Sequence, residues 1–191
     1  AALYNARHDL RVELLPEKQT LQAVDRITIE KSPADSLALA LSPRAEQIEV
    51  TVNGSFRKFE FEDGRLQLNL AAHEKNQEIL VTIRYTAIFD DPAPVRPVNA
   101  DNPGYGVSAT ISERGSFLLA GSGWYPHWAA GPSFYTLEVI APAGMLAVTA
   151  GQSKGHVTRN GKTESTWLIS DPIRGLSLSV GRYIVREKKV G

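Results

Sequence analysis

The chain contains no cysteine and a single methionine among its 191 residues. The absence of cysteine excludes disulfide bonds, cysteine nucleophiles and thiolate ligands for a metal. The 21 basic and 21 acidic side chains cancel, and they do not gather into long runs of one sign. Because nucleic-acid binding requires clustered Lys and Arg, this balance argues against nucleic acid as a partner.

Long apolar runs are also missing. No stretch approaches the roughly 20 apolar residues of a membrane-spanning helix, so we expect no membrane segment in this chain. No signal peptide is visible, and Ala1-Ala2 fits equally the remnant of a cleaved export signal or an artificial chain start. A cytoplasmic and an exported location therefore both stay open.

Alternation of apolar and polar residues is the dominant pattern, and its period of two is that of a β-strand. The first half of the chain shows it in short runs bounded by turn residues. Asn53-Gly54 and Asp63-Gly64 suit two-residue hairpin turns, with Phe59 and Phe61 on the strand between them. We therefore predict an all-β fold with little or no helix: an antiparallel meander forming a two-sheet sandwich or saddle, each strand with one buried and one wet face.

The alternation breaks in residues 89–103, FDDPAPVRPVNADNP, which carry four prolines. Proline removes a ladder donor, so this segment is predicted to be a long surface loop. Because strand-like runs resume beyond it, we predict one β domain over residues 1–185. Residues 186–191 form a basic exit tail that leads towards a domain outside this chain.

Motifs that would hold a metal are weak. His73-Glu74 begins the sequence HEKNQ, in which Gln77 stands where a zinc-binding HExxH motif needs its second histidine. This segment is predicted to be a solvated connection between strands. We therefore assign no catalytic residue, no metal ligand and no cofactor to this chain.

An aromatic cluster is the strongest candidate for a contact site. Trp124, Tyr125, His127 and Trp128 lie within five residues in a turn that contains proline. Such rings suit packing against another domain or stacking on a ligand, and they also suit plugging one end of a β core. The sequence leaves the core and surface alternatives open.

The order of these elements resembles the N-terminal β domain of zinc aminopeptidases of the aminopeptidase N type. The resemblance is carried by an alternating first strand, an I-x-V-x-V-N-G hairpin segment, L-x-L strands and an aromatic-proline turn followed by a P-A-G turn. In this chain these are His8–Leu14, Leu21–Ile29, Leu37–Leu41, Ile48–Gly54, Leu66–Leu70, Val81–Tyr85 and Gly123–Gly151. Two features depart from the family: the turn lacks the family's aspartate, and no glutamine lies between Phe117 and Pro126 to contact a substrate.

The resemblance implies a non-catalytic domain that walls or supports the cleft of a downstream catalytic domain of the same polypeptide. In the family that second domain binds zinc and removes residues from peptide N-termini, so zinc and peptide substrate belong to the parent protein. An alternative remains, a self-standing β-sandwich module that binds carbohydrate or a protein through Trp124 and Trp128.

Overall fold

The computed structural model describes residues 6–30, 35–92, 108–128 and 131–186. Within these ranges the regular structure is almost entirely β, and the helical elements are three short 3-10 turns: η1 (Pro16–Lys18), η2 (Ala72–Glu74) and η3 (Ala120–Ser122). No helix in the described part is long and apolar enough to cross a membrane. The predicted all-β class is confirmed.

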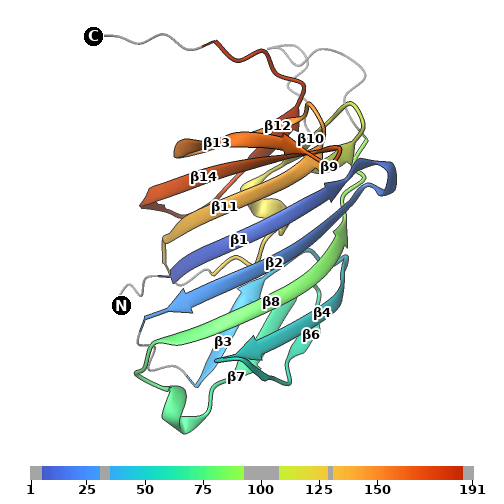
Figure 1. Cartoon of the computed structure of the whole chain (residues 1–191). Coiled ribbons are helices and arrows are strands. Elements are labelled where there is room, and N and C mark those ends of the chain that lie inside the picture. The colour runs from blue at the N-terminus through green and yellow to red at the C-terminus, as the bar shows by residue number, and fades with distance from the viewer. Residues whose placement is uncertain (1–5, 31–34, 93–107, 129–130, 187–191) are drawn as a thin grey trace, which may run out of the picture.

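The strands form three sheets (Figure 1). The eight-stranded sheet has the order β13 (Gln152–Arg159), β14 (Lys162–Ile173), β11 (Ser133–Pro142), β1 (Ala6–Leu15), β2 (Thr20–Ile29), β8 (Ile79–Ile88), β4 (Ala45–Val52) and β5 (Ser55–Phe56). The four-stranded sheet has the order β12 (Leu146–Thr149), β15 (Leu178–Gly181), β10 (Gly115–Leu118) and β9 (Ala109–Ser112). The three-stranded sheet has the order β3 (Ser36–Ala40), β7 (Arg65–Asn69) and β6 (Glu60–Glu62).

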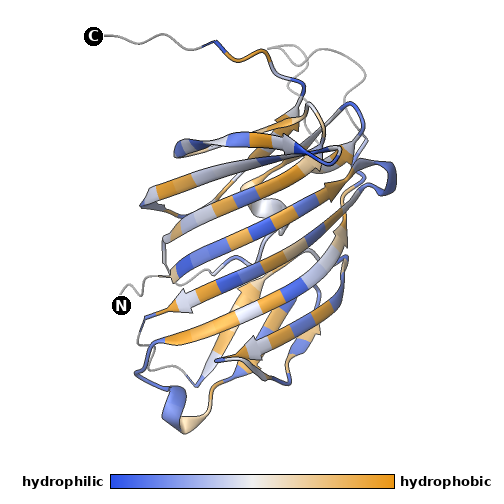
Figure 2. Ribbon diagram, viewed as in Figure 1, coloured by the Kyte–Doolittle hydropathy of each residue, from blue (hydrophilic) through white to orange (hydrophobic). Residues whose placement is uncertain are grey.

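The core lies between the large sheet and the two smaller ones. In Figure 1 the large sheet is the front layer, and the smaller sheets lie behind its upper and lower halves. Strands β1, β2 and β8 alternate strictly between buried and more exposed positions, which appears as alternating colours in Figure 2. The buried halves of all three sheets join in one hydrophobic cluster, as expected for strands with one wet face.

The predicted hairpin turns are confirmed. Asn53 and Gly54 have φ values of 49° and 81°, and Asp63 and Gly64 have 48° and 77°. Positive φ at both central positions is the geometry that Asn-Gly and Asp-Gly favour, because this turn matches the twist of the flanking strands. The turns join β4 to β5 and β6 to β7.

Two pairings differ from the predicted meander. The strand that returns from Asn53-Gly54 is β5, whereas Phe61 lies on β6 in a different sheet and Phe59 lies outside the strands. In addition, β11 pairs with β1 in parallel, with Leu10 opposite Leu137. The chain leaves the large sheet after β8, builds β9 and β10, and returns on the far side of β1, so the two strands run in the same direction.

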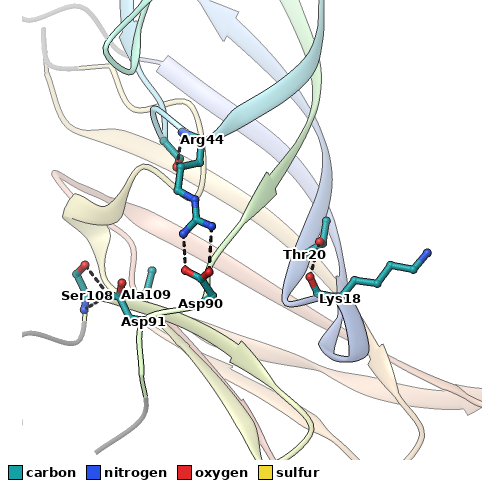
Figure 3. A network of polar contacts seen from close by, with 8 residues as sticks. Lys18, Thr20, Arg44, Asp90, Asp91, Ser108 and Ala109 are labelled. Carbon is teal, nitrogen blue, oxygen red and sulfur yellow. Dashed lines mark hydrogen bonds and ion pairs between the residues drawn. The ribbon is translucent and has the colours of Figure 1, made fainter.

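The start of the proline-rich segment is held firmly (Figure 3). Phe89 is buried, and Asp90 forms a bridge to Thr110 of β9 and an ion pair with Arg44. Asp91 accepts hydrogen bonds from the backbone N–H groups of Ala109 and Ser108 (2.9 and 2.7 Å), which hold the pKa of this carboxyl below its ordinary value. These first residues therefore form part of the sandwich, while residues 93–103 of the predicted loop lie outside the described ranges.

Replacing Leu39 by Ala tests which face of β3 is buried. The side chain of Leu39 is 1% exposed, so the substitution should lower the free energy of unfolding by about 2–4 kcal/mol in urea melts. The neighbouring exposed Ala40 provides the control, because Ala40→Ser should change stability by less than about 0.5 kcal/mol. A loss from Leu39→Ala as small as that of the control would mean that the faces are reversed.

Candidate domain interface

The aromatic turn follows η3 and precedes β11. Gly123 ends η3 in the left-handed region with φ 71°, and the chain then crosses behind the large sheet to reach β11. A Cβ at Gly123 would lie 2.4 Å from the backbone nitrogen of Ser42. Only glycine fits here, because both the φ value and the close approach of the backbone exclude a side chain.

Three of the four rings lie inside the core. Trp124 and Tyr125 are fully buried and Trp128 is nearly so, whereas His127 is half-buried. The ring centroids of Trp124 and Tyr125 are 4.9 Å apart with an edge-to-face arrangement that aromatic pairs favour. The platform of Trp124 and Trp128 expected for ligand stacking is therefore not on the surface of this chain, and the core alternative describes these rings.

Polar contacts tie the turn to the large sheet and to the segment between β14 and β15. The hydroxyl of Tyr85 on β8 donates to the carbonyl of Trp124 (2.6 Å). The indole N–H of Trp124 donates to the carbonyl of Leu176 (2.9 Å), and the N–H of Leu176 donates to the hydroxyl of Tyr125 (3.0 Å). Burial raises the pKa of both tyrosines, so the Tyr85 hydroxyl keeps the proton that it donates to Trp124.

Backbone bonds tie the same turn to β3. His127 and Ala40 exchange two hydrogen bonds of 2.8 and 2.9 Å, and Ser42 donates to the carbonyl of Gly123 (2.8 Å). The ring Nε2–H of His127 donates to the carbonyl of Arg174 (2.7 Å). The turn is therefore the joint at which all three sheets meet, and its rings fill the space between them.

Next to this joint lies a buried, hydrogen-bonded pair of side chains, His8 and Asp25. His8 Nδ1 and Asp25 Oδ2 are 2.7 Å apart, and both side chains are completely buried. The imidazole stacks on Tyr135 with ring centroids 4.7 Å apart and meets the edge of Tyr125 at 6.2 Å. His8 Nε2 and Asp25 Oδ1 have no hydrogen-bond partner among the described residues. The alternation of apolar and polar residues predicts that His8 and Asp25 face the core. It does not predict that the two side chains contact each other.

The segment His73-Glu74 is only partly solvated. His73 is exposed, while Glu74 at the end of η2 is buried, so the expected solvated connection is wrong for this carboxylate. Burial disfavours its ionised form, but the N–H of Ala71 (2.7 Å) and the guanidinium of Arg57 outweigh that effect and hold its pKa below the ordinary value. Within the described ranges no three His, Asp or Glu side chains come together as metal ligands, so these residues do not fit a zinc ion.

The four-stranded sheet presents a different kind of surface, which the sequence analysis did not single out. Its register places Val148, Ser179, Phe117 and Thr110 in one row across β12, β15, β10 and β9, and these side chains point away from the core. The next outward row contains Leu146, Gly181, Gly115 and Ser112. No charged side chain occupies an outward position on these four strands.

The outward face of the large sheet is charged by contrast. Strand β1 alone presents Arg7, Asp9, Arg11 and Glu13 on that side. Arg11 pairs with Glu138 of β11, and Glu13 pairs with Lys162 of β14. The outward faces of the eight-stranded and four-stranded sheets therefore differ: the first carries paired charges, and the strands of the second carry none.

The arrangement of three sheets has solved counterparts. An M1 zinc metallopeptidase from Deinococcus radiodurans matches with a TM-score of 0.68 and 20% sequence identity, over 93% of this chain and 41% of that one. A mutant bound to a Tyr-Ser-Ala substrate, from the same organism, gives 0.67 and 19% over 93% and 41%. A two-domain M1 zinc metallopeptidase mutant bound to L-tryptophan gives 0.68 and 20% over 95% and 43%. The fold is that of one part of the M1 zinc metallopeptidases.

No protein-family model and no curated protein matches the chain. The resemblance seen in the sequence is thus confirmed at the level of the fold. This chain spans less than half the length of the metallopeptidase chains that it matches.

Proposed function

We propose that this chain is the non-catalytic β domain of an aminopeptidase-like zinc metallopeptidase, and that it supports and walls the cleft of a following catalytic domain. The observation that carries the proposal is the extent of the structural match. It takes in 93–95% of this chain but only 41–43% of metallopeptidase chains, one of which is described as having two domains. The partner is then the rest of the same polypeptide, which holds the zinc and the peptide.

The chemistry of the chain fits this division of labour. A catalytic zinc needs three protein ligands and an open fourth position, and the described residues bring no such set together. The chain supplies a body of three sheets, and the buried rings of Trp124, Tyr125 and Trp128 hold the turn Gly123–Trp128 against these sheets. We propose that the half-buried His127 in this turn lies at or beside the wall of the cleft, while Trp124, Tyr125 and Trp128 hold it in place.

Removing the β domain tests the proposal. We expect the polypeptide that continues past Gly191 to hydrolyse aminoacyl reporter substrates and to contain one zinc ion. Without residues 1–185, its kcat/KM for a tripeptide should fall by at least about tenfold, because the substrate loses a wall that orients it. The 191-residue chain alone should retain no stoichiometric zinc in elemental analysis.

Two results would contradict the proposal. One is full peptidase activity of the remainder without the β domain. The other is one equivalent of zinc on the 191-residue chain that disappears when His73 or His127 is replaced.

A further inference from the structure

We infer that the outward side of the four-stranded sheet is the surface on which the downstream half of the polypeptide docks, an inference that rests on the proposed function. We call this surface the uncharged face. Its side chains are Phe117, Leu119, Leu146, Val148 and Ser179, with Tyr183 at its edge.

The first observation in favour of docking is that apolar side chains of this face are exposed. Phe117 on β10 and Leu119 directly after this strand are each 38% exposed, and Val148 on β12 is 45% exposed. Phe117 and Val148 lie on either side of the small Ser179 of β15, so a partner can approach the sheet closely between them. Among the described residues, the charged groups next to these strands in the sequence are Glu113 and Arg114 at the tip of the β9–β10 turn and Arg182 after β15. An apolar centre with a polar rim is the usual anatomy of a protein interface.

The sequence of two of these strands is the second observation. Strand β12 contains the apolar run Leu146–Val148, and on β10 the apolar Phe117 and Leu118 are followed directly by Leu119, whereas β1, β2 and β8 alternate. Continuous apolar runs are typical of strands that are covered on both faces. The inward positions Leu118 and Ala147 are covered by this chain. Of the outward positions, Thr110 is also buried, but Phe117 and Val148 are exposed and available to a partner.

The course of the chain identifies the occupant. Strand β15 lies between β12 and β10, and the chain leaves the sheet directly from it. The ring of Tyr183 then folds back over Gly181, at 3.4 Å from where a Cβ would stand. Ile184 and Val185, which follow, are 88% and 61% exposed. The polypeptide beyond this apolar segment therefore starts at the edge of the uncharged face, which favours docking of the same chain over a second copy or an unrelated partner.

Lysine substitutions on the two outer surfaces test this inference. In the polypeptide that continues past Gly191, Phe117→Lys combined with Val148→Lys should break docking, because lysine ammonium groups would be buried without partners. Leu80→Lys is the matched control, since Leu80 is 39% exposed but lies on β8 in the large sheet. Calorimetric scans should show a single transition for the wild type and the control. The double variant should show two transitions, the lower within about 3 °C of that of the 191-residue chain.

The same substitutions in the 191-residue chain should leave its melting temperature within about 3 °C of the wild type, which separates docking from folding. A zinc-containing polypeptide in which the double variant behaves like Leu80→Lys would overturn the uncharged face as the docking surface and leave the proposed function standing. A polypeptide without zinc would overturn the proposed function. Dimers of the 191-residue chain that the lysines abolish would also overturn the inference, because a second copy would then occupy the face.

Discussion

Replacing Trp124 by Ala should lower the free energy of unfolding by about 3–5 kcal/mol, among the largest effects of any single change in this chain. The indole is fully buried at the joint of the three sheets, and its N–H satisfies the carbonyl of Leu176. The substitution therefore opens a cavity and leaves a buried carbonyl without its donor. Urea unfolding monitored by circular dichroism measures the loss.

His127→Ala, in the same turn, is the control. His127 is half-buried, and its backbone bonds to Ala40 do not depend on the ring, so the loss should stay near 1 kcal/mol. If Trp124→Ala and His127→Ala were equally mild, the turn would not be the joint that holds the sheets together.

Breaking the couple of His8 and Asp25 should cost about 3–5 kcal/mol when one partner is removed, as in His8→Leu or Asp25→Leu. Each single variant leaves a polar or charged group inside the core, where both side chains are completely shielded from water. The double variant His8→Leu/Asp25→Leu should recover most of the loss, because two apolar side chains need no hydrogen-bond partners.

A double-mutant cycle in urea at constant pH measures this coupling. The expected result is a double variant close to the wild type in stability and far from the sum of the single losses. Strict additivity of the two losses would show that the side chains do not act as a pair. The cross-strand pair Arg26 and Asp9, which is exposed at 4.0 Å, offers a control whose coupling should stay below about 1 kcal/mol.

Local features of the fold could be predicted from the sequence because local chemistry determines them. The turns at Asn53-Gly54 and Asp63-Gly64 have positive φ at both positions, and Asn, Asp and Gly are the residue types that favour this conformation. Alternation likewise places Leu10 and Val12 on the inner face of β1. Strand β13 escaped prediction because every one of its residues is exposed, so it has no apolar period. Asn160-Gly161, with φ values of 51° and 74°, was the signal that could have revealed its hairpin with β14.

Non-local features could not be predicted, because they depend on which strands meet. Alternation predicts which face of the sheet a residue lies on. It predicts neither which strand lies next to its own strand nor whether the two strands run parallel or antiparallel. The parallel pairing of β1 with β11 and the contact between His8 and Asp25 therefore had no signal in the sequence. The aromatic turn was found as a cluster, but its burial follows from Tyr85 and Leu176, which lie 39 and 52 positions away from Trp124.

Docking of this β domain on a catalytic partner through the four-stranded sheet can be tested by hydroxyl-radical footprinting of side chains, in the 191-residue chain and in the polypeptide that continues past Gly191. We expect Phe117, Leu119 and Tyr183 to lose most of their labelling in the longer polypeptide, while Leu80 and Ile88 of the large sheet are labelled equally in both. Equal labelling of Phe117 and Leu119 in the two proteins would show that the downstream domain does not dock on this sheet.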